Sequence, residues 1–268
     1  WGEFPIAKLL PGKDYLKPEF NLIIDDMIDT SEQKKLQVFL EKWINKKINL
    51  ILKSLIDLKN YKDNKSNIRA LAYQLYENNG VIKREDVIDY TKALDQKERK
   101  ILRDIGVKFG RYHIYLHKLL KPEAVSLRLI LWKNFHQKYF DFKPPTFGLN
   151  FLESKKLLNK NFMLICGFEK FDNFFVRIDI LERLFIQIIN SNNQKRNEIM
   201  LVPEMLNLLG CSKDNFIKLI KKMNYKSIEK ENKVYFKYLP FKNRNNNNDA
   251  KKTNKDSPFS VLKALSIK

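Results

Sequence analysis

The spacing of apolar residues predicts that most of the first half of the chain is helical. From Ser31 to Leu55 the apolar residues recur every three or four positions and lysines lie between them, which is the pattern of one long amphipathic helix. The residues of this apolar face are Leu36, Phe39, Leu40, Trp43, Ile44, Ile48, Ile51, Leu52 and Leu55. A second helix is expected from about Ser66 to Gly80, because glycine readily adopts the left-handed conformation that ends many helices.

Two further helices are expected before the middle of the chain. Asp95 and Glu98 have the spacing of a capping box, so a short helix should begin there and end at Gly106. Pro122 suits the first position of the next helix, since that position needs no amide donor. The residues that follow Pro122 are apolar on nearly all sides, so this helix should be buried in the centre of the fold.

Short strands are expected in two places in the same half. Apolar and polar residues alternate on either side of Pro11-Gly12, which predicts two strands joined by a turn at that dipeptide. The segment GVKFGRYHIYLHKLLKP begins at Gly106 and alternates from Val107 to Leu116. This alternation predicts one short strand that leads to the buried helix.

The second half of the chain has the element order of a winged helix. Pro144-Pro145 marks a domain boundary, and NFFVRIDILERLFIQII beyond it predicts a strand or turn that leads into a helix. A short helix should run from Pro203 to Gly210, and a third helix should follow its cap, Ser212. The run KSIEKENKVYFKYL then predicts a hairpin.

These patterns predict a mainly α fold with minor β: a helical accessory region with short N-terminal strands and a winged-helix-like C-terminal module. The expected parts are a short β element at 1–29, a helical domain at 30–148 and the winged-helix-like module at 149–240. Residues 241–268 begin with a polar, basic run of low complexity, which predicts a disordered tail. Phe259, Leu262 and Leu265 recur near its end at helical spacing and predict a helix that docks on a partner or on the body.

The charge of the chain favours a polyanionic partner. The formal net charge is +20 and the isoelectric point is about 9.7, far more basic than solubility requires. A lysine-rich codon bias is the alternative source of this charge, but such a bias does not by itself suppress Asp and Glu. No run of apolar residues is long enough to span a bilayer, so no membrane partner is expected. Cys166 and Cys211 stand alone without C-x-x-C spacing, and a reducing cytoplasm is the expected location.

Motifs of catalysis are missing from the sequence. It contains no phosphate-binding G-x-x-x-x-G-K-[ST] loop, no G-x-G-x-x-G, no H-E-x-x-H and no G-x-S-x-G, so the chain alone is not expected to hydrolyse ATP or peptides. His113 and His117 have the spacing of a metal pair on a helix, but the surrounding RYHIYL is typical of a strand. A structural histidine pair is therefore favoured, and no metal site is predicted. The chain begins with Trp1 and has the character of a piece of a longer protein.

The sharpest candidate for binding is the lysine face of the helix after Ser212. Phe216, Leu219, Ile220 and Met223 form its expected inward stripe, which leaves Asn215, Lys218, Lys221 and Lys222 outside. Such a face can lie against a phosphate backbone, and a solvated basic face is the equally weighted alternative. Further candidate contacts are Lys226 and Lys233 of the hairpin and Lys108 and Arg111 of the 106–122 segment. Lysine contacts of this kind would position a strand without reading its bases.

Four motifs resemble one family. GVKFGRYHIYLHKLLKP, VRIDILERL, LVPEMLNLLGCS and the terminal DSPFSVLKAL occur in this order over most of the chain. They resemble the C-terminal region of alphaproteobacterial superfamily 2 helicases of DExH-box type, related to the mitochondrial degradosome RNA helicase. His117 departs from the family pattern, which tends to have Pro at that position.

The resemblance implies an upstream motor that binds ATP and Mg, although this chain has no cofactor motif of its own. The region would then be an accessory module that guides or clamps RNA or DNA, with RNA slightly preferred. The alternative function is a protein-docking module in which Phe259, Leu262 and Leu265 recruit a partner such as a nuclease. Docking through apolar residues should be nearly indifferent to salt, whereas capture of a strand by lysines should weaken steeply as salt rises.

Overall fold

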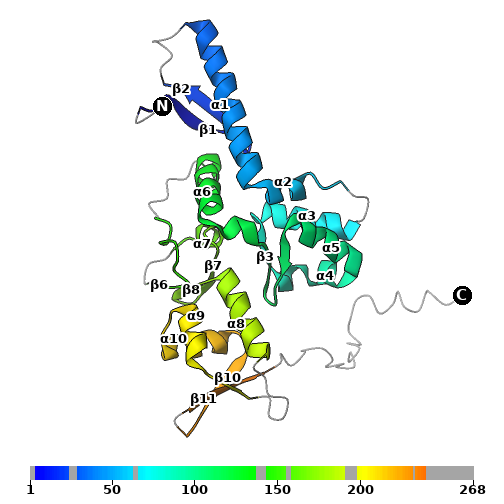
Figure 1. Cartoon of the computed structure of the whole chain (residues 1–268), viewed down its shortest axis with the longest axis vertical. Helices are drawn as coiled ribbons and strands as arrows, with labels where there is room; N and C mark the ends of the chain where they lie inside the picture. Colours follow the sequence, from blue (N-terminus) through cyan, green and yellow to red (C-terminus); the bar gives the residue numbers. More distant parts are fainter. Residues whose placement is uncertain are drawn as a thin grey trace, which may run out of the picture.

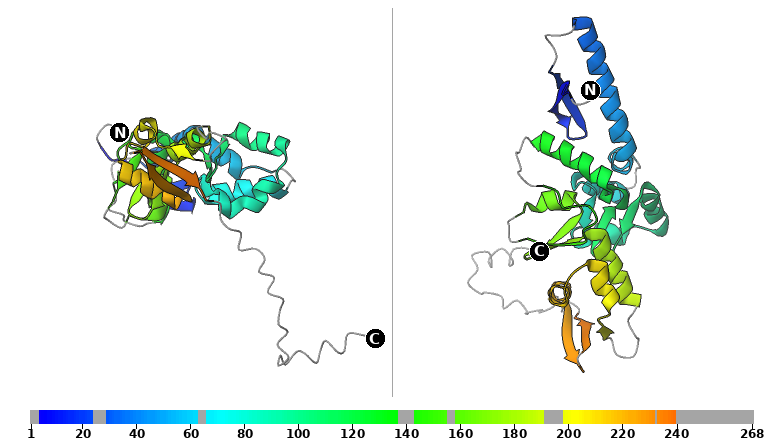
Figure 2. Two further views of the ribbon diagram at one scale, coloured as in Figure 1. Left: turned by 90° about the horizontal axis from the view of Figure 1, so that it is seen from below. Right: turned by 60° about the vertical axis from the view of Figure 1, so that its left-hand side comes forward.

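The chain folds into an elongated, helix-rich molecule with small antiparallel sheets, as the sequence predicts at this level. The structure, a computed structural model, describes residues 4–23, 29–62, 66–136, 143–154, 158–190, 198–231 and 233–239. Helix α1 (Thr30–Ile51) projects at one end of the long axis and the hairpin β10–β11 (Tyr225–Lys230, Lys233–Tyr238) forms the other end (Figure 1, Figure 2). Of the helices in the described ranges, none combines the length and the hydropathy that crossing a bilayer requires.

The N-terminal hairpin forms as expected, but its turn lies elsewhere. Strands β1 (Ala7–Asp14) and β2 (Lys17–Leu22) pair antiparallel, and the chain turns at Tyr15 and Leu16. The predicted turn at Pro11-Gly12 is wrong, because this dipeptide lies within β1, where the register shifts between Leu10 and Asp14. A Cβ atom at Gly12 would overlap the carbonyl of Lys17, so glycine permits the close approach of the two strands there.

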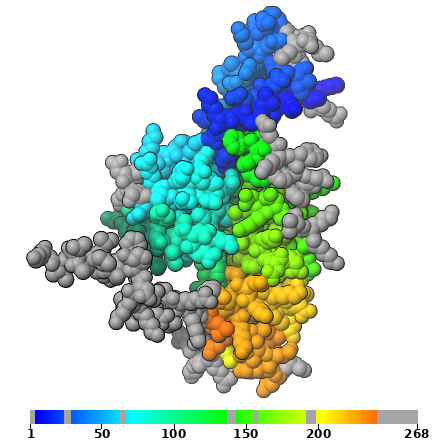
Figure 3. All heavy atoms as spheres, turned by 180° about the vertical axis from the view of Figure 1, so that it is seen from behind, coloured from blue at the N-terminus to red at the C-terminus, as the bar shows by residue number. Residues whose placement is uncertain are grey.

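The predicted long helix is present but breaks before its end. Asp29 caps α1 by accepting a 2.8 Å hydrogen bond from the amide of Thr30. The helix ends at Ile51, and a separate helix α2 (Lys53–Lys59) follows Leu52. Only the second half of the apolar face is buried, since Phe39 and Trp43 are 57% and 50% exposed. Figure 3 shows the first half of α1 projecting beyond the body of the molecule.

The helical domain continues with α3 (Ser66–Glu77), the 3-10 turn η2 (Arg84–Val87), α4 (Ile88–Ala93) and α5 (Gln96–Ile105). The capping box predicted for α5 is confirmed, and Gly106 ends this helix with a φ of 112°. The predicted strand from Val107 to Leu116 is instead two strands, β4 (Val107–Phe109) and β5 (His113–Leu116), which pair with each other. Strand β3 (Val81–Lys83) completes the sheet in the order β3-β5-β4.

Helix α6 (Pro122–His136) is the buried central helix that the sequence predicts. It follows the 3-10 turn η3 (His117–Leu120) and begins at Pro122. Its residues contribute to two apolar cores: Ala124 and Leu131 belong to the core of the helical domain, whereas Val125, Leu129 and Trp132 pack against the following domain. The side chain of Arg128 lies between them and is fully buried.

A small sheet comes next, of which the sequence predicted only the segment of β8, as a strand or turn. Strands β6 (Phe151–Glu153), β7 (Phe168–Phe171) and β8 (Phe174–Arg177) form it in the order β6-β8-β7. Helix α7 (Lys160–Ile165), capped by the side chain of Asn159, packs against β7 and α6. This sheet separates α6 from the last group of elements (Figure 1).

The last group, residues 178–238, is called the terminal module below. It contains α8 (Ile178–Asn190), β9 (Ile199–Met200), α9 (Pro203–Leu209), α10 (Lys213–Lys222) and the hairpin β10–β11. The three strands form an antiparallel sheet in the order β10-β11-β9. The predicted order of helices and hairpin is confirmed, and the additional strand β9 joins them. The tail residues Phe259, Leu262 and Leu265 lie outside the described residues.

Candidate nucleic-acid interface

The sheet of the terminal module has one buried face and one exposed face. Alternate residues of its strands are buried: Ile199, Tyr225 and Phe236 belong to the core formed with α8 and α10, and Val234 is buried on the same face. The residues between them therefore lie on the opposite face. This outer sheet face consists of Met200, Lys226, Ile228, Lys230, Lys233, Tyr235 and Lys237.

Lysines on the outer sheet face stand directly opposite one another. Lys226 pairs in register with Lys237, and Lys230 pairs with Lys233. Like charges at opposed positions of an antiparallel pair destabilise the sheet. The ammonium of Lys230 is compensated by Glu198 at 2.8 Å. In the part of the chain that the structure describes, no ion pair involves Lys226, Lys233 or Lys237, so these three charges face solvent.

Helix α10 has the predicted inward stripe. Phe216, Leu219, Ile220 and Met223 are all buried. The helix is held at its start by Ser212, whose hydroxyl accepts a 3.3 Å hydrogen bond from the amide of Asn215. The amphipathic pattern therefore gave the correct orientation of α10.

The outward face of α10 is divided between solvent and the neighbouring sheet. The side-chain amide of Asn215 donates a hydrogen bond to the carboxylate of Glu153 on β6. The ammonium of Lys222 lies 2.9 Å from Asp172, at the turn between β7 and β8. Lys218 and Lys221 are exposed. Two of the four predicted contact residues thus already have partners, and no ion pair among the described residues involves the other two.

Arg111 lies beside the terminal module, whereas Lys108 belongs to a different sheet. The guanidinium of Arg111 is 5.4 Å from the ring centre of Tyr238 on β11 and 5.8 Å from that of Tyr112. Burial alone would lower the pKa of Arg111, but its electrostatic interaction with the neighbouring Tyr112 raises it above the ordinary value. Lys108 is exposed on β4, an edge strand of the β3-β5-β4 sheet.

A buried cluster of charges holds Arg111 in place. The carboxylate of Glu182 on α8 accepts hydrogen bonds from the backbone amides of Arg111, Tyr112 and His113 at 2.5, 3.0 and 2.8 Å. The imidazole of His113 lies between this carboxylate, at 3.3 Å, and that of Glu169, at 3.2 Å. Lys83 binds the other oxygen of Glu169 at 3.0 Å. The cluster links the helical domain to β7 and α8.

The charged state of this cluster follows from its contacts. Burial alone would lower the pKa of His113, but its hydrogen bonds to Glu169 and Glu182 raise it above the ordinary value. Burial alone would raise the pKa of Glu169, but His113 and Lys83 lower it. These contacts favour the cationic form of His113 between the two carboxylates, at the junction between the helical domain and the elements β7 and α8.

The other candidate reactive groups are isolated. His117 lies in η3 and contacts the carbonyl of Gly106 at 3.1 Å, so the two histidines do not share a site. Burial raises the pKa of the Cys166 thiol to about 12 and that of Cys211 to about 11, which disfavours the reactive thiolates. In the described ranges, no three residues among His, Cys, Asp and Glu are placed to hold a metal ion.

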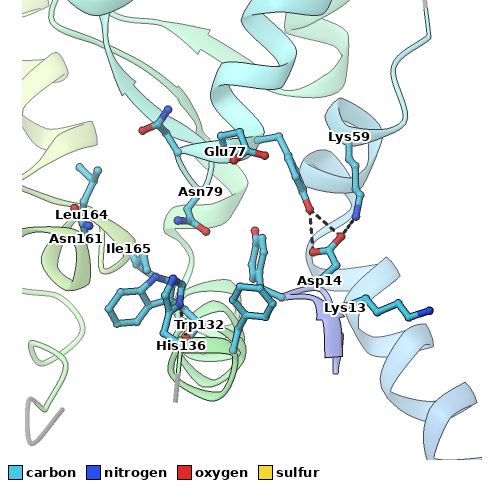
Figure 4. A pocket seen from close by; sticks show the side chains of 14 residues that line it. Lys13, Asp14, Lys59, Glu77, Asn79, Trp132, His136, Asn161, Leu164 and Ile165 are labelled. Atoms are coloured by element: carbon cyan, nitrogen blue, oxygen red, sulfur yellow. Dashed lines mark hydrogen bonds and ion pairs between the residues drawn. The ribbon is translucent and has the colours of Figure 1, made fainter. Parts of the chain in front are cut away.

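A cleft of about 510 Å³ lies between the N-terminal hairpin, α3, α6 and α7 (Figure 4). On one side, Asp14 binds Lys59 and accepts hydrogen bonds of 3.1 Å from the Tyr76 hydroxyl. On the other side, the rings of Trp132 and His136 pack with their centres 4.9 Å apart. The cleft is lined by two cations, Lys13 and Lys59, and by two anions, Asp14 and Glu77. Because these charges balance, the cleft does not favour a polyanion.

Sequence reasoning missed Tyr235 and Met200 on the outer sheet face. Alternation along KVYFKY places Tyr235 on the sheet face opposite to that of the buried Phe236, but only the register of the strands shows that Ile228 and Met200 are its neighbours.

Comparisons of the chain with protein-family models, with curated proteins and with solved structures gave no match.

Proposed function

We propose that this chain is the accessory C-terminal region of an ATP-dependent DExH-box helicase, where it guides or clamps a nucleic-acid strand for an upstream motor. The observation that carries the binding function is the outer sheet face, on which Lys226, Lys233 and Lys237 have no ion-pair partner among the described residues. Opposed lysines destabilise a sheet unless an anion lies between them, and phosphates supply that anion.

The winged-helix assignment is supported by the order of elements in the terminal module. Its order is helix, strand, helix, helix, strand, strand, and its first strand β9 pairs with the last strand β11. Lys218 and Lys221 are exposed on α10, which packs against the inner face of the sheet, so they form a second basic surface apart from the outer sheet face. The upstream motor, with its ATP and Mg, is supported by the four motifs that resemble the helicase family. RNA is slightly preferred over DNA on the same basis.

Binding is tested by charge reversal at both ends of the molecule. Labelled RNA and DNA strands are titrated with the chain at several salt concentrations, and fluorescence anisotropy reports the affinity. Lys226→Glu with Lys233→Glu should weaken binding at least tenfold, and wild-type log affinity should fall linearly with log salt. The matched control is Lys34→Glu with Lys35→Glu on the exposed start of α1, which makes the same change in net charge. Equal loss from both pairs would reject a specific interface.

The motor assignment has a separate test. The gene upstream of Trp1 should encode a G-x-x-x-x-G-K-[ST] loop in the same reading frame. Purified chain without that segment should show no ATPase activity. ATP hydrolysis by the chain alone would contradict the proposal.

Protein docking is the second candidate function, and the exposed apolar residues of α1 favour it. Val38, Phe39 and Trp43 lie in its projecting half and are each about half exposed. Docking there would bury apolar area on a protein surface and would change little with salt. Replacement of Phe39 and Trp43 by Ser should then abolish partner binding and leave nucleic-acid affinity unchanged.

A further inference from the structure

We propose that the outer sheet face binds single-stranded nucleic acid, with one base stacked on Tyr235 and with phosphates held by the lysines on either side. This inference rests on the proposed nucleic-acid-binding function. It adds the strandedness of the ligand and a contact to a base.

The register divides the outer sheet face into three rows that run across the strands. Lys226 and Lys237 form the first row, and Lys230 and Lys233 form the third. The middle row consists of Ile228, Tyr235 and Met200 on β10, β11 and β9. Residues two apart on a strand are separated by about 7 Å, so each row of lysines lies within reach of a nucleotide placed on the middle row.

The middle row is apolar and aromatic on a face that is otherwise basic. Met200 is 40% exposed, and Ile228 and Tyr235 are half-buried by their neighbours. The ammonium of Lys230 lies 5.9 Å from the ring centre of Tyr235, so a cation already sits close to the aromatic ring. An aromatic ring between lysines is the combination that single-strand-binding surfaces use, because every base has a face that can stack.

The contacts of α10 disfavour the binding of a duplex against this helix. Insertion of this helix into a major groove would bring its polar face against the phosphate backbone. Asn215 and Lys222 on that face are bound to Glu153 and Asp172, and these two carboxylates would repel the phosphates. Bases in a duplex are also stacked on each other and cannot stack on a side chain. A single strand on the outer sheet face has bases that are free to stack, and among the described lysines of that face only Lys230 is paired with a carboxylate, that of Glu198.

The test uses the full chain and fluorescein-labelled oligouridine, with a duplex of matched length as the second probe. Tyr235→Ala should weaken oligouridine binding by roughly tenfold without changing the salt slope, because stacking is not electrostatic. Tyr235→Phe should bind as the wild type does, since the ring is retained. Lys226→Gln with Lys237→Gln should instead reduce the salt slope by about 1.4, the value for two phosphate contacts on a single strand.

Controls separate binding from folding. Tyr73→Ala removes an exposed tyrosine on α3 and should leave the affinity unchanged. Urea unfolding of each variant shows whether the fold is intact. If Tyr235→Ala does not fold, Tyr235→Leu keeps an apolar residue in the middle row and still removes the aromatic face, so it should show the same loss.

The outcomes distinguish this inference from the function on which it rests. Unchanged oligouridine affinity in folded Tyr235→Ala or Tyr235→Leu, together with a reduced salt slope in the lysine variant, would overturn stacking and leave the binding function in place. Tighter binding of the duplex than of oligouridine would also overturn the inference. Absence of salt-dependent binding to either probe would reject the proposed function itself.

Discussion

One carboxylate oxygen of Glu182 contacts both the backbone and the side chain of His113. This oxygen lies 2.8 Å from the backbone amide nitrogen of His113 and 3.3 Å from Nδ1 of its imidazole. The other ring nitrogen of His113 contacts Glu169, which in turn binds Lys83. These four side chains come from β5, α8, β7 and β3, so the charged cluster joins the helical domain to the elements that lead to the terminal module.

His113 should make the stability of the fold depend on pH. The pKa of His113 is raised above 6.5, so its contribution is complete below that value and is lost as pH rises through the folded-state pKa. The pKa of Glu169 is lowered below 4.5, so its contribution is complete above 4.5 and is lost as pH falls through its folded-state pKa. The cluster should therefore contribute most to the stability of the fold between pH 4.5 and pH 6.5.

Replacement of His113 by Gln tests this dependence. The variant should be destabilised by about 3 kcal/mol near pH 6, because two buried carboxylates lose the cation between them. The difference from wild type should shrink as pH rises above the folded-state pKa of His113. Urea unfolding at several pH values gives both free energies. Parallel curves for the two proteins would show that His113 does not titrate between the folded and unfolded states.

Gly110 should be coupled to Glu182. A Cβ atom at Gly110 would overlap the Glu182 carboxylate, which lies against the backbone of residues 111–113, and would also come within 2.7 Å of the backbone carbonyl oxygen of His113. Gly110→Ala should cost about 1–3 kcal/mol of unfolding free energy through overpacking. The cost should be smaller in a Glu182→Ala background, where the carboxylate is absent. A double-mutant cycle in urea measures the coupling, and strictly additive effects would contradict the proposed overlap.

Arg128 should be essential for stability. Its guanidinium is fully buried and donates to the backbone carbonyls of Asn79, Leu119 and Ile165 at 2.8, 2.6 and 2.8 Å. Burial lowers its pKa to about 10, but the group remains a cation at neutral pH. Arg128→Met should destabilise the fold by about 3 kcal/mol or more, because two buried carbonyls and one partly buried carbonyl lose their donor.

Two comparisons make the measurement on Arg128 specific. Arg128→Lys should recover little of the loss, since one ammonium cannot reproduce the planar array of donors that reaches three segments. Arg183→Met, on the exposed side of α8, should change the free energy of unfolding by less than about 0.5 kcal/mol. Equal and small effects of Arg128→Met and Arg183→Met would contradict the structural role of Arg128.

Helix ends could be predicted from the sequence because single residues determine them. Asp95 and Glu98 form the capping box, and Gly106 and Gly210 have the positive φ expected at the ends of α5 and α9. The position of the first turn could not be predicted, since Pro11-Gly12 is also suited to a bulge. Strands such as β6, with only three residues, are too short for alternation to be recognised.

The charges of the candidate interface could be predicted from the sequence, but the contacts of its residues could not. Spacing placed Lys221 and Lys222 on the outer side of α10, where both are exposed. It could not place Asp172 beside Lys222, because the two residues are far apart in sequence and meet only when the small sheet packs beside α10. In the same way, the carboxylates that surround His113 come from positions 56 and 69 residues away.

The contacts of α10 give the rival binding surface its own test: if phosphates lie against α10 instead of the outer sheet face, Lys221 and Lys222 should contribute unequally to nucleic-acid binding, although they are adjacent and equally charged. Asp172 compensates Lys222, whereas the pairs described for the terminal module leave Lys221 uncompensated. Lys221→Gln should lower the slope of log affinity against log salt by up to about 0.7, the value for one phosphate contact on a single strand. Lys222→Gln should lower it less. Asp172→Asn should raise affinity by releasing Lys222, and none of the three changes should alter stability by more than about 0.5 kcal/mol, since both partners are exposed. Equal slopes for Lys221→Gln and Lys222→Gln, measured by fluorescence anisotropy with oligouridine, would show that the Asp172 pair does not hold Lys222 away from phosphate.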